Sequence, residues 1–590
     1  MAKRKRWLPE YRLLRRYLPL VYEDLGATYS RSLHKWLLIA PIIGISTGLV
    51  VTAVAVIILK QMWPAVLNFY LAHHWSMIVG LTVGFAVTGF IMQFLTPNPD
   101  EHSTEEIIQS YHAHRGAVTM RAFVPKLIAA ITTVGMGGSA ALEGPSIYGG
   151  GAIGSWLWTK LGRLHLEPRD RRIMLISGAA AGMAAVFRAP LTGLVFALEM
   201  PYKDDLAHEA LLPSLISSVV AYITLAAFLG AKPIFNFKSA TSFTGRDLLW
   251  CALLGIAIGL IALVFAITFR RVRTFVVKWT APHWVKMTVG GFFTGLCGLG
   301  FVSIYHGSLT PLGPNYDAVS MILNMNHGPL ELVVFGILKL VATLFSLAFG
   351  GVSAMFVPLF LTGGAFGSAF GQAVVHSSSL ELYAAVGMAA FIAAGYKTPL
   401  AAVVFVAEAT GGHAFIIPAL IGAAVAYGVS GDASVSGDQR VNEAARVFEL
   451  TGVPVGDFMH REVVSVQASS SLREFEDVLS ADHRHAIFPV LDDHRVVGTV
   501  SSSLLNTVPP EQWGTTKVSN VMERKFTHVH SDCDAMEALR LLLREKSRPI
   551  LFVTSSTGEL EGIVTKTDIL DALKARGEPE KAFQPADETA

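Results

Sequence analysis

The sequence predicts a polytopic α-helical membrane protein that carries an α/β domain of cytosolic type at its C-terminal end. The 590-residue chain is 52% hydrophobic and only 16% charged, with 53 glycines, a composition that excludes an ordinary soluble enzyme. At least ten apolar segments of bilayer-spanning length lie between residues 36 and 430. Beyond about residue 430 the charge density rises to that of a soluble domain.

Residues 1–34 form a basic segment in front of the first apolar run. Its first sixteen residues, MAKRKRWLPEYRLLRR, include seven Lys and Arg. Positive charge next to a first span stays on the cytoplasmic side, so we expect a cytoplasmic N-terminus in a plasma (inner) membrane. A basic run can also bind nucleic acid, but beside a span a topogenic role is the better interpretation. The segment has no apolar core or cleavage site, and no removable signal peptide is expected.

Residues 35–430 are predicted to form the transmembrane domain. The clearest spans carry almost no charge, and tryptophans stand at segment ends, where indole rings favour the interface. These spans are 36–60, 76–95, 211–230 and 248–268, with Trp36, Trp75 and Trp250 at segment ends. The three cysteines are scattered and suggest neither a disulfide framework nor a metal site.

The membrane part contains an internal repeat. The segment GGSAALEGPSIYGGGAIGS (137–155) aligns without gaps on GGVSAMFVPLFLTGGAFGS (350–368) at a shift of 213 residues. A second pair, GAAAGMAAVFRAPLTGLVFALE (178–199) and GMAAFIAAGYKTPLAAVVFVAE (387–408), aligns at a shift of 209 and matches the glutamates that end both segments. Two matches in one order make chance similarity a poor explanation. Duplicated halves with Gly/Pro-interrupted apolar segments indicate a transporter-type fold whose site lies at the repeat interface.

The prolines of the first aligned pair mark the start of two helices. Pro145 and Pro358 suit the first helical turn, where a missing N–H costs nothing. Glu143-Gly144 and Phe356-Val357 would then stand at the two helix N-termini. Free N–H groups and the positive end of the helix dipole favour negative charge, so two facing N-termini near the midplane predict an anion site.

Glu143 has a predicted role at this site. Its ionised carboxylate can occupy the N–H groups that a permeating anion would use, and its protonation would free them. The alternative is a capping acid that only stabilises the fold. An ionisable group inside an apolar repeat costs about 2.5–3.5 kcal/mol on membrane insertion and marks function by default, which favours a gate.

These segments resemble those of the CLC chloride channel and transporter family. ALEGPSIYGGGAIG is similar to the family's G-(K/R)-E-G-P segment, and SAMFVPLFLTGGAFG to its G-x-F-x-P segment. The resemblance implies a homodimer in which each subunit holds its own anion pathway, formed by an inverted repeat. It also implies that Glu143 is the gating glutamate. Backbone donors to the anion are then expected at Gly144, Met355, Phe356 and Val357.

The sequence departs from the family pattern before the gating acid and at the serine motif. Leu142 and Ala141 replace the usual basic residue and glycine. The motif whose serine contacts the anion corresponds to EHSTEE, which puts His102 at the serine position. A protonated imidazole there would attract anions and make conduction pH-dependent. Alternatively, Ser103 and Glu106 form a capping box that starts a helix in any protein.

Two further departures concern the inner side of the pathway. Ser436, in SVSGDQR, is the nearest match to a tyrosine that helps to close this side in the family. Met200 stands where the family's exchangers commonly carry a proton-delivering glutamate, and its channels an apolar residue. Because methionine cannot carry a proton, Met200 favours channel-like conduction, as in voltage-gated chloride channels. A proton-coupled chloride or anion exchanger is the alternative, and the changed anion contacts leave open a small anion other than chloride.

The C-terminal part repeats one plan. Residues 431–454 form a polar linker, two similar segments follow at 455–510 and 518–575, and a polar tail occupies 576–590. Each copy opens with V-x-x-x-M and continues with a valine-rich run, a helix and a strand pair. This resembles a pair of cytosolic CBS domains that pack as a pseudo-dimer, so both termini are expected in the cytoplasm.

The second copy ends in GIVTKTD, which fits the nucleotide-binding pattern of CBS domains. The resemblance gives Thr565 a phosphate contact and Asp568 a ribose contact, and implies ATP, ADP or AMP as an optional ligand. In the first copy Leu504 replaces the acid. The alternative is that Asp568 only begins a helix, without a ligand. No cofactor is required.

Other functions fit the sequence less well. An intramembrane protease would need a Ser/His pair, paired aspartates or H-E-x-x-H on its spans, and none is seen, so we expect no enzyme. A CBS-containing magnesium transporter would need clustered carboxylates, whereas Glu143, Glu199 and Glu408 are far apart in the sequence. A regulatory membrane sensor is a further alternative. The expected partners are a small anion, protons in the exchanger case, membrane lipid and a second copy of the chain, but not nucleic acid.

Overall fold

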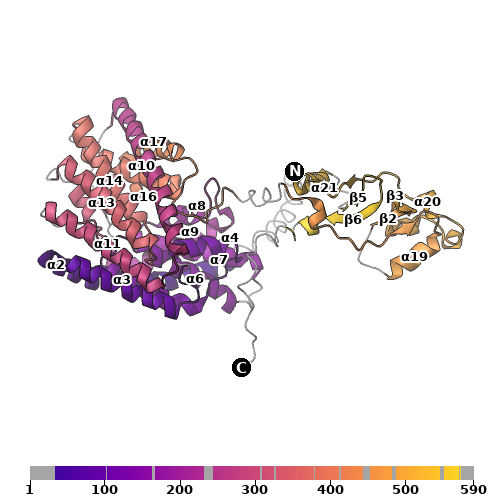
Figure 1. The fold of residues 1–590 in the computed structure, drawn as a ribbon, viewed down its shortest axis with the longest axis horizontal. Coiled ribbons are helices and arrows are strands. Elements are labelled where there is room, and N and C mark those ends of the chain that lie inside the picture. The colour runs from indigo at the N-terminus through magenta and orange to yellow at the C-terminus, as the bar shows by residue number, and fades with distance from the viewer. Residues whose placement is uncertain are drawn as a thin grey trace, which may run out of the picture. The chain divides into compact units, whose positions relative to one another are not determined.

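The chain forms two compact units, and the boundary between them falls after Val441, within the predicted linker (Figure 1). The first unit is helical, and the second contains two small β-sheets. The computed structural model describes residues 34–100, 103–161, 166–231, 235, 243–305, 309–323, 327–377, 379–410, 413–442, 452–481, 487–544, 550–569 and 572. His102 lies outside the described residues, so its anion contact stays a prediction.

The first half of the membrane unit starts with one long helix. Within the described residues, seven helices are long and apolar enough to cross a membrane, and four shorter apolar ones accompany them. The first-half helices are His34–Ala72, which includes a π-helical turn at Val56–Met62 and α2 (Trp63–Ala72), then α3 (Ser76–Leu95), α4 (Ser103–His112), α5 (Phe123–Gly135), α6 (Glu143–Lys160), α7 (Pro168–Phe187), α8 (Pro190–Glu199) and α9 (Leu211–Leu229).

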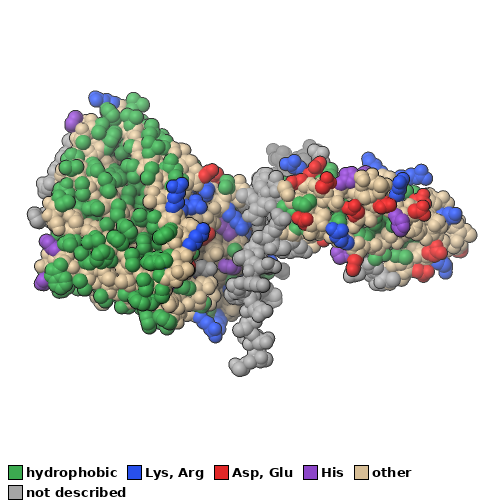
Figure 2. Space-filling model, viewed as in Figure 1, with side chains coloured by type: hydrophobic (Ala, Val, Ile, Leu, Met, Phe, Trp, Pro, Cys, Tyr) green, Lys and Arg blue, Asp and Glu red, His purple; other side chains and the backbone are tan. Residues whose placement is uncertain are grey.

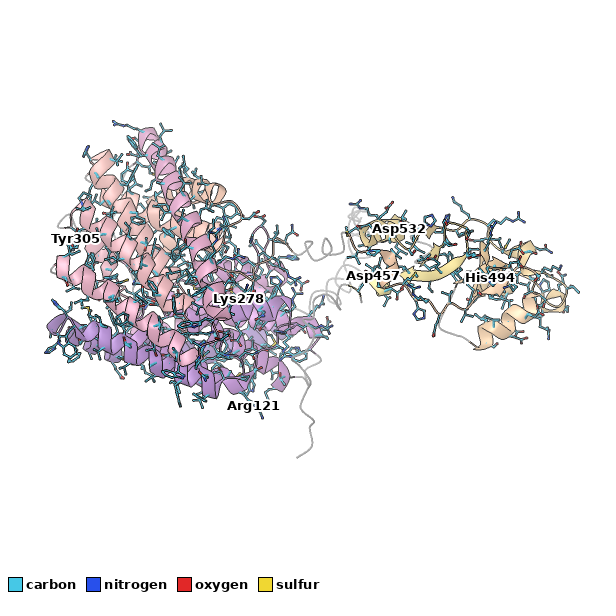
Figure 3. The ribbon with its side chains drawn as sticks, in the orientation of Figure 1. Arg121, Lys278, Tyr305, Asp457, His494 and Asp532 are labelled. Atoms are coloured by element: carbon cyan, nitrogen blue, oxygen red, sulfur yellow. The ribbon has the colours of Figure 1, made fainter. Side chains whose placement is uncertain are left out.

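The second half begins with the longest single α-helix among the described elements, α10. Helix α11 then crosses the unit from near Lys278, the last residue of α10, to Tyr305, both labelled in Figure 3. The second-half helices are α10 (Gly245–Lys278), α11 (His283–Ile304), α12 (Ala318–Ile322), α13 (Pro329–Ala348), α14 (Phe356–Phe370), which continues into a π-helical turn at Gly371–Val375, α15 (Leu380–Tyr396), α16 (Pro399–Thr410) and α17 (Ile416–Val429).

Glycine contacts confirm the repeat in three dimensions. A Cβ atom added at Gly150 of α6 would lie 1.9 Å from the carbonyl oxygen of Gly178 in α7, and the reverse contact is equally close. In the second half, Gly363 of α14 and Gly387 of α15 make the same reciprocal contact at 2.2 and 2.1 Å. Only glycine permits such close backbone approach, so both helix pairs pack through glycine for the same reason.

The aligned glutamates Glu199 and Glu408 cap each other's helices. Glu408, near the end of α16, accepts hydrogen bonds at the N-terminus of α8, and Glu199, at the end of α8, does the same for α16. The donors are Leu191 N–H (3.0 Å), Thr192 N–H (2.7 Å) and Thr192 Oγ1 (2.7 Å) for Glu408, and Leu400 N–H (3.0 Å) and Ala401 N–H (2.8 Å) for Glu199. Each helix end therefore meets the start of its counterpart, which makes the repeat an inverted one.

The C-terminal unit contains two sheets of identical topology. In each, a short first strand pairs parallel with the second, which pairs antiparallel with the third. The elements are β1 (Val466–Gln467), α19 (Leu472–Ala481), β2 (Ile487–Asp492), β3 (Arg495–Ser501), α20 (Val518–Val521), β4 (His528–Val529), α21 (Ala535–Arg544), β5 (Ile550–Thr554) and β6 (Leu560–Thr565).

The two V-x-x-x-M segments are exchanged between the sheets. Val455 and Met459 pack in the core of the second sheet, while Val518 and Met522 pack with the core of the first. The sequence motif that opens each copy thus completes the other copy's core. This exchange explains why two copies occur together, since neither core is complete without the other's segment.

The surfaces of the two units differ in polarity. Figure 2 shows the visible face of the membrane unit covered mainly by hydrophobic side chains, whereas acidic and basic side chains are interspersed over the C-terminal unit. Exposed apolar side chains such as Leu38, Phe90 and Val264 are 72%, 57% and 64% accessible, values that suit contact with lipid tails.

Candidate anion-transport site

The segments that precede α6 and α14 contact each other directly. The Ala141 N–H donates to the Ala354 carbonyl oxygen at 3.2 Å in an antiparallel bridge. Gly144 lies so close to this strand-like segment that an added Cβ would be 2.6 Å from the Ala354 backbone nitrogen. Both residues of the bridge occupy the same position in the two repeat halves, so the two helix starts face each other across the repeat interface.

Glu143 is held at this interface by Phe356. Its Oε1 accepts a hydrogen bond of 2.7 Å from the Phe356 N–H, the first amide of α14. The side chain is fully buried, and among the described residues its Oε2 has no hydrogen-bond partner. Val357 N–H, next along the helix, also lacks an intrahelical acceptor by its position. The carboxylate therefore occupies the N-terminus at which the sequence predicts an anion.

Aromatic rings pack around the side chain of Phe356, the residue whose amide binds Glu143. The Phe356 ring centroid lies 5.4 Å from those of Phe187 and Phe196 and 4.9 Å from that of Phe405. Such a shell excludes water, and a low-dielectric environment strengthens the attraction between an anion and the helix N–H groups.

Tyr396, which sequence reasoning missed, also reaches this site. Its hydroxyl oxygen accepts a 3.0 Å hydrogen bond from the Met355 N–H, and its ring lies 6.2 Å from that of Phe356. Met355, predicted as an anion donor, thus gives its amide to Tyr396. The sequence signal was the repeat itself: Tyr396 aligns with Phe187 at the shift of 209, one turn before the proline that starts α16.

Ser436 and Met200 lie in one hydrogen-bonded loop region. The Ser436 hydroxyl donates to Glu105 Oε2 at 3.0 Å, so in this structure it faces an acid. Met200 is buried, and its carbonyl oxygen accepts from the Gln439 side-chain amide at 3.1 Å. The same amide donates to the Tyr396 carbonyl oxygen at 2.8 Å. The Ser436 N–H donates to Ser434 Oγ, which donates to the carbonyl oxygen of Gly395, the neighbour of Tyr396. Both predicted inner-side positions therefore lie near Tyr396, together with Glu105, which the sequence reasoning did not single out.

The capping box predicted at the start of α4 is not formed. Ser103 begins the helix with φ of 61°, and its buried hydroxyl has no hydrogen-bond partner among the described residues. Glu106 instead accepts a 2.6 Å hydrogen bond from Lys126. The helix start expected at Ser103 is thus confirmed, but the serine hydroxyl does not supply the capping bond.

Lys339 is a second buried cation that the sequence did not reveal. This α13 side chain is fully buried and donates to the carbonyl oxygens of Pro311 (3.0 Å) and Gly313 (2.8 Å). The Gly313 N–H in turn donates to the Gly137 carbonyl oxygen at 2.8 Å, in the loop before α6. The Lys339 amine is thus tied to the loop that leads to Glu143, although Leu142 replaces the usual basic residue.

In the C-terminal unit, Thr565 and Asp568 bind each other. Asp568 Oδ2 accepts from the Thr565 N–H at 2.7 Å and from its hydroxyl at 2.8 Å. The geometry is that of a capping pair, as in the ligand-free alternative. Nucleotide binding stays a prediction.

Carboxylates of the membrane unit do not gather around a common point. Glu199 and Glu408 each accept hydrogen bonds from a helix N-terminus, and no cluster of three or more metal-ligating side chains occurs among the described residues. This arrangement disfavours the cation-transport alternative, because Mg²⁺ needs oxygen ligands from several groups.

The fold and the site define a multi-pass membrane protein in which two helix starts face each other around a buried carboxylate. Residues 83–431 match the family model described as voltage gated chloride channel, and residues 455–505 and 518–575 each match the CBS domain. The chain therefore belongs to the voltage gated chloride channel family and carries two CBS domains. Membership places it among chloride transport proteins.

Similar proteins include some that are named as exchangers. A protein named H(+)/Cl(-) exchange transporter ClcA, from Yersinia pestis bv. Antiqua (strain Angola), is 27% identical over 401 residues, which cover 65% of this chain and 82% of that protein. An uncharacterized protein of Methanocaldococcus jannaschii is 25% identical over 393 residues, which cover 67% of this chain and 92% of that protein.

Solved structures share the fold. A eukaryotic CLC transporter superposes with a TM-score of 0.62 at 18% identity, covering 91% of this chain and 98% of its own. A CLC-type fluoride/proton antiporter superposes with a TM-score of 0.60 at 21% identity, covering 70% of this chain and all of its own. At these identities the likeness describes architecture only.

Proposed function

We propose that this protein exchanges chloride, or another small anion, for protons, and that Glu143 both blocks the anion site and carries the proton. The supporting observation is the bond from the Phe356 N–H to the Glu143 carboxylate, at a buried helix start. An anion and an ionised carboxylate compete for the same N–H groups. Protonation removes the charge that holds Glu143 there, so anion binding and proton binding are linked at one position.

The relatives favour exchange over the channel-like conduction that Met200 suggested. Those at 27% identity carry the name H(+)/Cl(-) exchange transporter. Met200, buried and unable to hold a proton, remains the observation in favour of a passive channel. Channel-like conduction is therefore the second candidate.

Flux measurements on the purified full-length protein in liposomes separate the two candidates. Under an outward chloride gradient, the exchanger drives protons into the vesicles against a pH gradient, whereas a channel moves chloride alone. Glu143→Gln should keep anion flux and lose proton movement. Glu209→Gln serves as a matched control, because Glu209 is an exposed acid outside the site. Chloride flux without proton movement in the wild type would reject exchange.

The anion itself is tested in the same vesicles. Chloride, bromide, nitrate and fluoride are supplied in turn, and proton movement is recorded for each. We expect the anion that drives protons best to be the one that competes best with the Glu143 carboxylate. Absence of flux with every anion, at acidic and neutral pH, would contradict anion transport altogether.

Several features of the assembly belong to the same proposal. We infer a homodimer with one anion pathway in each subunit, in a plasma (inner) membrane, with both termini in the cytoplasm. The basic segment 1–34 supports this orientation. An adenine nucleotide at Thr565 and Asp568 would be a regulatory ligand, because transport itself needs no cofactor.

A further inference from the structure

Proton exchange needs a proton acceptor on the side opposite to the one from which Glu143 is loaded, and Met200 cannot supply it. The structure shows where this side lies. Residues 200–204 hydrogen-bond to the segment that precedes the C-terminal unit: the Lys203 N–H donates to the Arg440 carbonyl oxygen at 2.7 Å, and the Arg440 N–H to that of Pro201 at 3.2 Å. We call this the tail side, because the chain continues from here into the C-terminal unit.

The acid next to Met200 in sequence is already engaged. Both oxygens of Glu199 accept hydrogen bonds from the first amides of α16. Protonating Glu199 would weaken two bonds that join the repeat halves. Asp204 is hydrogen-bonded to Tyr427. A proton on Glu199 would thus loosen the cap of α16, and a proton on Asp204 would compete with its bond to Tyr427.

Glu105 is an acid of the tail side with a different setting. It lies in the first turn of α4, is partly exposed, and accepts a hydrogen bond from the Ser436 hydroxyl at 3.0 Å. The Gly437 amide and the charged side chains of Arg273 (α10) and Asp438 also face its carboxylate. Its partial exposure gives the carboxylate access to water on the tail side.

Tyr396 connects Glu105 to the anion site. Its hydroxyl binds the amide of Met355, the neighbour of the Phe356 amide that holds Glu143. On the other side, the Ser434 hydroxyl and the Val435 N–H donate to the carbonyl oxygen of Gly395, next to Tyr396, and Ser436 of the same segment donates to Glu105. The Tyr396 hydroxyl oxygen accepts a 3.0 Å hydrogen bond from the Met355 N–H. The hydroxyl can therefore donate its own proton to another acceptor. Among the described residues no acceptor is hydrogen-bonded to this proton, so an anion or a carboxylate can take that place.

We propose that Glu105 is the tail-side proton acceptor of the exchange cycle, and that Tyr396 stands between it and Glu143. Glu105 takes up a proton from water on the tail side. The Tyr396 hydroxyl gives its proton to the Glu143 carboxylate and receives one from Glu105, which returns to the carboxylate form. One O–H bond breaks and one forms at each transfer, and no electrons are exchanged. The inference rests on the proposed exchange function.

The test is Glu105→Gln in the full-length protein, with anion and proton fluxes recorded together in liposomes. Glutamine keeps the length and an acceptor oxygen for Ser436, so we expect anion flux within about twofold of wild type and proton flux lowered about tenfold or more. Glu105→Asp should restore part of the proton flux. Unchanged proton flux in Glu105→Gln would overturn the proposal.

Two further variants distinguish a proton acceptor from a loop anchor. Ser436→Ala removes the hydrogen bond but leaves the acid, so it should lower proton flux less than Glu105→Gln does. Tyr396→Phe keeps the ring but removes the hydroxyl, so its proton flux should fall while anion flux persists. If Ser436→Ala lowers proton flux as much as Glu105→Gln, the acid acts only through the loop. A wild type without proton movement would instead reject the exchange function itself.

Discussion

Glu143 and Phe356, which occupy the same position in the two repeat halves, are joined by a 2.7 Å hydrogen bond from the Phe356 amide to the Glu143 carboxylate. The repeat thus brings two helix starts together but gives only one of them an acid. A symmetric site with two carboxylates would repel anions permanently. With one acid, the charge of the site depends on a single proton.

This relationship predicts the sign of the pH dependence of anion flux. An ionised Glu143 blocks the helix start, and protonation releases it, so wild-type flux should rise as pH falls. Glu143→Gln should give flux that is high and nearly independent of pH. Halide efflux from liposomes, measured from neutral to acidic pH, checks both. A Gln variant that keeps the wild-type pH profile would assign the titration to another residue, such as His102.

The reciprocal caps predict a stability effect at a distance from the anion site. Glu408→Ala removes the acceptor for two N–H groups and a hydroxyl at the start of α8, and we expect a loss of about 1–2 kcal/mol in the free energy of unfolding. Thermal unfolding in detergent measures it. Glu408→Gln should lose less, because an amide oxygen still accepts. Equal stability of the alanine variant and wild type would show that these caps contribute nothing.

The glycine contact between α6 and α7 predicts a folding defect. In Gly150→Ala the new methyl group would lie 1.9 Å from the Gly178 carbonyl oxygen, so the two helices would have to separate. We therefore expect the yield of folded protein to fall. Gly300→Ala is the matched control, since a Cβ there meets nothing within 4 Å. Size-exclusion profiles after detergent extraction compare the two. Normal profiles for both variants would contradict the close packing.

The CBS pair gives a ligand-binding prediction. If an adenine nucleotide binds as proposed, Asp568→Ala should lower its affinity about tenfold or more, since a charged hydrogen bond to a ribose hydroxyl is lost. Calorimetry with AMP and ATP on the full-length protein measures this. Asp532→Ala, an exposed acid of the same unit, should bind as wild type does. No binding by the wild type would leave Asp568 with its helix-capping role alone.

Local patterns explain the predictions that the structure confirmed. The apolar segment 76–95 coincides with α3, and Pro145 and Pro358 lie in the first turns of α6 and α14. Hydrophobic length and proline position act within one helix, so they can be recognised in sequence. The repeat could also be found, because duplicated segments keep their glycines where two helices touch.

Contacts between distant residues could not be predicted in the same way. The sequence reasoning did not single out Tyr396 of α15, whose hydroxyl accepts a hydrogen bond from Met355 at the site. The Ser103 hydroxyl does not form its half of the capping box, and Glu106 accepts a hydrogen bond from Lys126 of α5. In both cases the deciding partner comes from another helix.

By itself, the sequence determined that this protein is a duplicated membrane protein with a lone acid at a broken helix and a soluble tail of two similar modules. Composition, periodicity and spacing carry that information, because burial in lipid and helix initiation are local requirements. Only the tertiary structure decided which amide Glu143 binds, that Glu199 and Glu408 cap each other's helices, and that Glu105, Ser436 and Tyr396 lie together. These relationships join residues that are separated by tens to hundreds of positions, and packing of the two inverted halves is what brings them into contact.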